Sequence, residues 1–226
     1  MELWIPREVL RVTTSPSRKS PMTLYCSPRC AYGHGVRFVL SEKAIAADIE
    51  YLQGDATPRD LLEANPLGNT PTLVDRDLVL SDSRIIMEYL DERFPHPPLQ
   101  AMDPVARARA RMTVRRIDQD WFGYLDQIDQ SPDPRKKSKA AKQLQKELIG
   151  ASPVFDAKPY FLSDDFSLVD CALAPLLWRL GALGIDLPTQ AEPIRSYANR
   201  LFRRPAFKAS LSAREREYPT LAEASA

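Results

Sequence analysis

Two cysteines near the start of the sequence have the residue type and spacing that thiol chemistry would need. Cys26 ends a predicted strand and precedes a predicted helix, a placement that can lower the pKa of a thiol. Cys30 follows four residues later, so the pair is one residue longer than the C-x-x-C redox motif, which weakens a redox interpretation. The indication of a metal site is weaker still. The sequence has only two histidines, His34 and His96, and no second pair of cysteines to complete a set of ligands. Cys26 is therefore the candidate catalytic residue, whereas Cys30 and Cys171 are expected to be structural or incidental.

Thr70 and Pro71 are the next residues of chemical interest, because the proline enters a predicted buried strand at 72–74. Proline cannot donate a ladder hydrogen bond, so its presence there needs a structural reason. In the thioredoxin-like fold that reason is a cis peptide bond, which turns the N–H and C=O of the preceding residue outward. We therefore predict a cis Thr70–Pro71 bond, with Thr70 placed to pair with an extended peptide as a sheet edge would.

Two pairs of polar residues stand where helices are predicted to begin. Asp82 and Ser83 open a helix whose unpaired N–H groups and partial positive charge suit a carboxylate ligand. Asp and Ser are also favoured as plain N-caps, so the ligand site and the cap both stay open as interpretations. Ser167 and Asp170, a hydroxyl followed three residues later by a carboxylate, match a capping box and are given a structural role.

The elements that position these residues follow from hydrophobic periodicity. The order strand, helix, strand, helix, strand, strand, helix predicts a small mixed sheet covered by helices on both faces. Strands are predicted at 22–25, 49–52, 72–74 and 78–80. Helices are predicted at 34–44 and 82–93, and a further one is predicted to begin after the N-cap Thr57.

A run of prolines separates this unit from a second, helical one. Pro95, Pro97 and Pro98 exclude a helix interior, so a stiff boundary is expected there. Beyond it, Asp103 and Asp133 are predicted N-caps followed by first-turn prolines, and the first of these helices is expected to run to a stop at residue 131. The apolar stretch at 171–183 is predicted to be a buried central helix. The predicted fold class is α/β plus all-α: a leader at 1–21, a thioredoxin-like domain at 22–94, a proline linker at 95–99, an all-helical domain at 100–218 and a tail at 219–226.

The composition narrows the classes of function. The 226 residues carry 31 Lys and Arg against 30 Asp and Glu, a formal charge of +1, so direct nucleic-acid binding by phosphate neutralisation is not expected. The longest strongly apolar stretch, at 171–178, is much shorter than the ~20 residues that a membrane helix needs. Three cysteines do not make a disulfide framework, which favours a reducing compartment such as the cytoplasm.

The thioredoxin-like unit, the proline linker and the helical unit with its capping box resemble the glutathione transferase fold. Within that superfamily, the segments 83–99 and 158–180 are similar to the stringent starvation protein A family, and the resemblance covers about 22–218. It implies a bacterial cytoplasmic homodimer that associates with RNA polymerase and its sigma factor, regulates transcription in stress and starvation, and lacks transferase activity. The family's Pro-His-Pro surface motif, needed for function, matches Pro95, His96 and Pro97.

Two hypotheses for function follow. In the first, the protein is a non-enzymatic regulator that needs no cofactor and uses the proline corner, the segment 95–98, as part of a contact surface. The alternative for this segment is that it only links the two domains. In the second, it is a glutathione-dependent transferase or thiol-active enzyme. Cys26 would then face the sulfur of glutathione, Thr70 would pair with its cysteine, and Asp82 and Ser83 would hold its γ-glutamyl carboxylate. Asp82 is one methylene shorter than the Glu usual in that pair, so it reaches less far toward the γ-glutamyl group.

Overall fold

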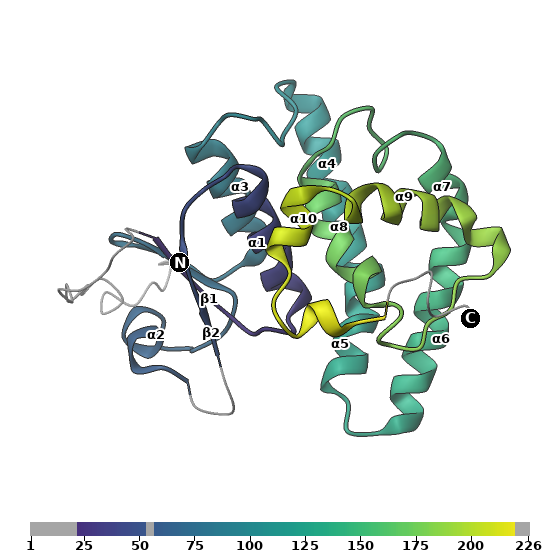
Figure 1. Cartoon of the computed structure of the whole chain (residues 1–226), viewed down its shortest axis with the longest axis horizontal. Coiled ribbons are helices and arrows are strands. Elements are labelled where there is room, and N and C mark those ends of the chain that lie inside the picture. The colour runs from purple at the N-terminus through teal and green to yellow at the C-terminus, as the bar shows by residue number, and fades with distance from the viewer. Residues whose placement is uncertain (1–21, 53–56, 220–226) are drawn as a thin grey trace, which may run out of the picture.

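The computed structural model describes residues 22–52 and 57–219; the predicted leader and residues 220–226 of the predicted tail lie outside this range. Four strands form one mixed sheet in the order β2-β1-β3-β4, of which Figure 1 labels β1 and β2. Strand β1 is parallel to β2 and antiparallel to β3, which is antiparallel to β4, so the predicted mixed sheet is confirmed. The strands are β1 (Met22–Cys26), β2 (Asp48–Tyr51), β3 (Thr72–Asp75) and β4 (Leu78–Leu80).

Side chains alternate between the two faces of this sheet, and each face is covered by helices. Leu24 and Leu73 point into the main core, which the inner faces of α1 (Ala31–Glu42) and α3 (Ser83–Arg93) complete. Tyr25 and Val74 point the other way and pack against Leu61 of α2 (Arg59–Ala64). Helices on both faces were predicted from the order of elements, and the structure confirms them.

The starts of two helices differ from the prediction. Helix α1 begins at Ala31 rather than at His34, because Cys30 has an extended backbone and its thiol caps the first turn. Thr57 is not the N-cap of α2: Pro58 occupies that position, and no side chain makes a cap hydrogen bond there. Both differences are local, because a cap is decided by the conformation of one residue rather than by the apolar pattern.

The second unit is helical, and its predicted N-caps are confirmed. The Asp103 side chain accepts a hydrogen bond from the Ala106 N–H at 2.7 Å, and that of Asp133 accepts from the Arg135 N–H at 2.9 Å. The single helix expected up to residue 131 is instead interrupted by a π-helical turn at η2. The elements are α4 (Pro104–Ile117), η2 (Asp118–Phe122), α5 (Gly123–Gln130), α6 (Pro134–Gly150), α7 (Ser152–Asp156), α8 (Leu168–Arg179), η3 (Thr189–Ala191), α9 (Glu192–Phe202), α10 (Pro205–Ser210) and η4 (Glu215–Glu217).

Helix α8 is the central element of the molecule. It lies against α1 and α9, and its side chains share one continuous core with those of the sheet (Figure 1). The predicted capping box is confirmed: the Asp170 carboxylate accepts from the Ser167 N–H at 2.8 Å, and it also accepts from the Phe161 N–H and the Tyr197 hydroxyl. Within the described ranges, no helix is both long enough and apolar enough to cross a membrane.

Candidate functional site

The residues predicted to bind glutathione gather at one end of the sheet. Tyr25 pairs with Thr72, so Cys26 at the end of β1 lies beside the Thr70–Pro71 bond that precedes β3. That bond is cis, as predicted. Because β4 runs back toward the same end, the start of α3 at Asp82 also lies there.

Cys26 does not have the properties expected of a catalytic thiol. Its side chain is fully buried, and a Cβ added at Gly33 in α1 would lie only 3.0 Å from the Cβ of Cys26. Burial raises the pKa of Cys26 to about 12, although nearby Arg37 opposes the effect. A placement between a strand and a helix can lower the pKa of a thiol, but burial of the Cys26 side chain outweighs that effect here.

Cys30 is the thiol that occupies the helix N-terminus. It is partly exposed, it is the N-cap of α1, and its Sγ accepts a hydrogen bond from the Gly33 N–H at 3.5 Å. From the sequence it was expected to be structural or incidental. Alternation in β1 supplies the missed signal: Leu24 and Cys26 share the core face, so the first cysteine free of that face is Cys30.

Asp82 acts as an N-cap in this structure. Its Oδ1 accepts from the N–H groups of Arg84 and Ile85 at 2.8 and 3.1 Å, while the neighbouring Ser83 is buried. Asp82 is thus a plain cap in its observed contacts, and the N–H groups of Arg84 and Ile85 already have a carboxylate partner. Among the described residues, no cluster of three or more His, Cys, Asp or Glu residues could hold a metal ion.

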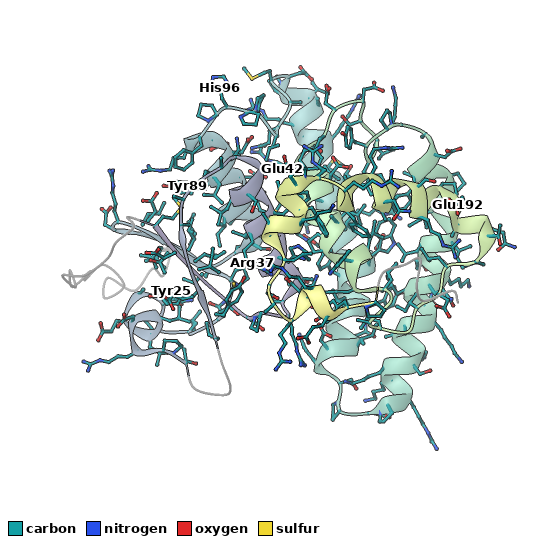
Figure 2. The ribbon with its side chains drawn as sticks, viewed as in Figure 1. Tyr25, Arg37, Glu42, Tyr89, His96 and Glu192 are labelled. Carbon is teal, nitrogen blue, oxygen red and sulfur yellow. The ribbon has the colours of Figure 1, made fainter. Side chains whose placement is uncertain are left out.

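The proline corner lies at the opposite end of α3. Pro95, His96, Pro97 and Pro98 are all exposed, and Figure 2 shows His96 at the rim of the molecule. The His96–Pro97 bond is cis, which was not predicted from the sequence. Helix α3 has 11 residues, so at 1.5 Å per residue about 16 Å separates the corner from the glutathione-site residues. The corner and the glutathione-site residues therefore lie at opposite ends of α3, and one groove is lined by residues from both ends, Asp82 and Pro97 among them.

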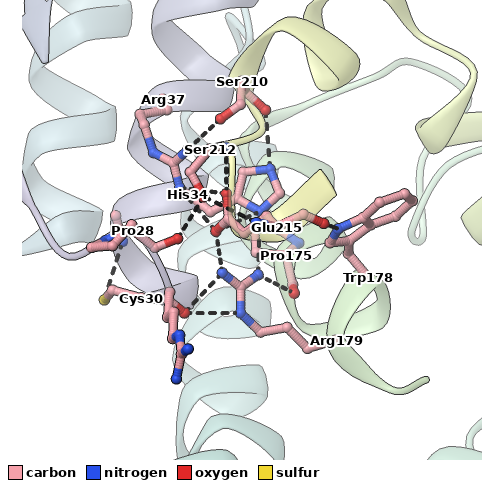
Figure 3. A network of polar contacts seen from close by, with 12 residues as sticks. Pro28, Cys30, His34, Arg37, Pro175, Trp178, Arg179, Ser210, Ser212 and Glu215 are labelled. Carbon is pink, nitrogen blue, oxygen red and sulfur yellow. Dashed lines mark hydrogen bonds and ion pairs between the residues drawn. The ribbon is translucent and has the colours of Figure 1, made fainter. Parts of the chain in front are cut away.

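A buried ionic cluster joins the two domains, and no pattern in the sequence predicted it. Glu215, fully buried, binds Arg37 of α1 through both carboxylate oxygens at 2.9 Å and also binds Arg179 of α8 (Figure 3). The backbone C=O of Glu215 accepts from the Trp178 indole N–H at 2.9 Å. One carboxylate thus compensates two guanidinium groups, one in each domain.

The same cluster reaches the loop before α1. Arg179 donates from Nη2 to the backbone C=O of Arg29 at 3.0 Å, and the Ser212 hydroxyl donates to the C=O of Pro28 at 2.6 Å. Cys30 follows directly (Figure 3). The segment around Glu215 therefore helps to hold the loop that presents the partly exposed thiol.

His34 lies inside this cluster as a neutral imidazole. Its Nδ1 is 3.2 Å from Nη1 of Arg179, and because a guanidinium can only donate, Nδ1 must accept. Its Nε2 then carries the proton and donates to the Ser210 hydroxyl at 3.0 Å, which in turn donates to the Phe207 C=O. Burial, together with the charges of Arg179 and Arg37, holds the pKa of His34 well below its usual range.

Comparison with known proteins agrees with this architecture. Residues 24–98 match the model for the glutathione S-transferase N-terminal domain, and residues 115–205 match the model for the C-terminal domain. A solved glutathione transferase Omega 3C from Trametes versicolor superposes with a TM-score of 0.76 at 25% identity, covering 91% of this chain and 88% of that one. The class is therefore a two-domain protein of the glutathione S-transferase fold.

Curated relatives define the family within that class. A stringent starvation protein A homolog of Coxiella burnetii is 48% identical over 201 residues, covering 88% of this chain and 96% of that protein. The homolog from Pasteurella multocida is 47% identical, covering 88% of this chain and 94% of its own length. The chain belongs to the stringent starvation protein A family.

Proposed function

We propose that the protein is a transcription regulator that associates with RNA polymerase and its sigma factor in the bacterial cytoplasm. It acts in the response to stress and starvation through protein contacts, without transferase chemistry and without touching DNA directly. The observation that carries the proposal is the exposed corner of Pro95, His96 and Pro97. The Pro residues on both sides fix the backbone around the imidazole, which lowers the entropy cost of a contact. The near-neutral charge of +1 agrees with a protein rather than a nucleic acid as the direct partner.

The experiment is co-purification of RNA polymerase holoenzyme with tagged protein. His96→Ala is expected to retain less than about a tenth of the wild-type polymerase, as for an interface anchor. Lys139→Ala, an exposed substitution on α6, is the control and is expected to leave retention unchanged. Full retention of polymerase by His96→Ala would remove the corner from the contact surface.

We further propose that the protein is a homodimer that pairs through the faces of α3 and α4. Ile85, Met102, Val105 and Met112 on this side are more than half exposed. They lie in or beside a groove of about 1180 Å³ whose lining carries five Arg and five Asp or Glu residues. A surface that presents both signs of charge can pair with a copy of itself about a two-fold axis. Val105→Asp with Met112→Asp should yield a monomer in light scattering, and a persistent dimer would exclude this face.

A second candidate, a glutathione-dependent thiol activity, is favoured by one specific observation. The partly exposed thiol of Cys30 caps α1 at the same end of the sheet as Thr70, Pro71 and Ser83. Calorimetric titration with glutathione tests it: micromolar binding with conjugation that Cys30→Ser abolishes and Cys26→Ala preserves would establish this activity. Little or no heat on titration would reject the glutathione-dependent activity and leave transcription regulation as the proposed function.

A further inference from the structure

We propose that Lys43 and Asp91 are positioning residues that hold the proline corner in the conformation it presents to its partner. This inference rests on the proposed function of the corner. The two side chains are buried, with 0% and 7% exposed, and Nζ of Lys43 lies 2.7 Å from Oδ1 of Asp91. A buried ion pair is a poor source of stability compared with apolar side chains of the same volume. Its value here lies in the groups that it binds.

Lys43 binds one carbonyl directly before the corner and one within it. Its Nζ is 2.5 Å from the C=O of Phe94 and 2.6 Å from the C=O of Pro97. An ammonium group has three donors, and the third is used on Asp91. All three N–H bonds of one buried cation are therefore committed to fixing this segment.

Asp91 binds the first amides that follow the prolines. Its Oδ1 accepts from the Leu99 N–H at 2.9 Å and its Oδ2 accepts from the Gln100 N–H at 3.1 Å. The segment cannot fix itself through backbone hydrogen bonds in the ordinary way, because the prolines at 95, 97 and 98 have no N–H. Side chains from outside the segment must supply the bonds instead.

The Lys43–Asp91 pair fixes the exposed proline corner relative to two packed helices. Lys43 is the C-cap of α1 and Asp91 lies in the last turns of α3, so the corner is aligned on two packed helices. The C=O of Leu99 also accepts from the Leu168 N–H at the start of α8, at 2.9 Å, which attaches the corner to the helical domain. His96 itself is exposed and takes no part in these bonds. A loop held in its bound conformation loses less entropy on association.

The test compares Lys43→Met, Asp91→Leu and the double variant for stability, amide exchange and polymerase affinity. Each single variant leaves a lone buried charge and should unfold more easily, whereas the double variant should recover stability because no charge remains buried. In Lys43→Met, exchange of the Leu99 and Gln100 amides should speed up about tenfold although Lys43 does not touch them. The folded double variant should still bind polymerase about tenfold more weakly than wild type. Wild-type affinity in the stable double variant would overturn the proposal.

Two controls separate this inference from neighbouring explanations. Glu215→Gln destabilises the protein at the domain seam without touching the corner, and should keep polymerase affinity. If His96→Ala binds polymerase as wild type does, the proposed function of the corner fails. The positioning role is then decided by amide exchange alone: exchange of the Leu99 and Gln100 amides that is faster in Lys43→Met than in the destabilised Glu215→Gln supports it, and equal exchange in the two variants overturns it.

Discussion

Glu215 binds Arg37 from 178 positions further along the sequence, with both carboxylate oxygens 2.9 Å from one guanidinium nitrogen. This contact joins the segment after α10 to the first helix of the thioredoxin-like unit, across the seam between the domains (Figure 3). The same carboxylate binds Arg179 of α8. One buried negative charge therefore balances two guanidinium groups at the seam.

Glu215→Gln should lower the free energy of unfolding by about 3–5 kcal/mol, because it leaves Arg37 and Arg179 buried without a counter-ion. Urea denaturation followed by fluorescence measures the change. Glu217→Gln, in the same short helix but at an exposed pair with Arg214, should change stability by no more than about 0.5 kcal/mol. Equal losses of unfolding free energy in the two variants would show that the buried cluster contributes no more to stability than an exposed ion pair does.

His34 should make the protein less stable in acid. Its folded pKa lies below the ordinary value of about 6.5, so between these two values the unfolded protein binds a proton that the folded protein refuses. The contribution of His34 to the free energy of unfolding is fully present above about pH 6.5. Below that pH it falls by about 1.4 kcal/mol per pH unit. His34→Gln should flatten this part of a stability–pH curve measured from pH 7.5 to 5.5, and an unchanged curve would contradict the neutral assignment.

The three cysteines should differ sharply in reactivity toward an alkylating reagent. Cys30 is partly exposed, whereas Cys26 and Cys171 are fully buried and burial raises the pKa of both thiols. The native protein should therefore be modified rapidly at one cysteine only, and Cys30→Ser should abolish that fast phase. Denaturant should expose the other two. Rapid labelling of Cys26 in the native protein would refute the buried placement, and peptide mass mapping assigns each site.

Ser167→Ala should lower the free energy of unfolding by about 1 kcal/mol, because the first turn of α8 loses its cap. Asp170→Ala should cost more, since the Phe161 N–H, the Ser167 N–H and the Tyr197 hydroxyl would all lose their buried acceptor. Ser138→Ala, exposed on α6, is the matched control, with an expected change of no more than about 0.5 kcal/mol. A Ser167→Ala loss no larger than the control's would show that the cap is not stabilising.

Much of the fold could be predicted because its signals are local. Alternating apolar residues, the proline before β3 and the Asp-Pro starts at Asp103 and Asp133 each act within a few residues. The burial of Cys26 was missed because the strand period was not carried one residue beyond Tyr25. Continued from Leu24, that period places Cys26 in the core.

The remaining parts of the site could not be predicted, because they depend on distant partners. Glu215 sits among charged residues in the sequence and looks like part of a solvated tail. Only the tertiary fold brings Arg37 and Arg179 to it. Lys43 and Asp91 are likewise ordinary helix residues until the backbone turns at the prolines and presents its polar groups to them. The π-helical turn at η2 breaks no rule of the apolar stripe, so the stripe could not reveal it.

The cap made by Asp82 has a consequence for any anion that approaches α3. The N–H groups of Arg84 and Ile85 already hold a carboxylate that is covalently attached two or three residues away. An acid that approaches these two N–H groups must therefore compete with a tethered carboxylate, whose effective concentration is high because the tether is short. This helix brings its own counter-anion, so a soluble metabolite can bind these two N–H groups only after the Asp82 carboxylate leaves them.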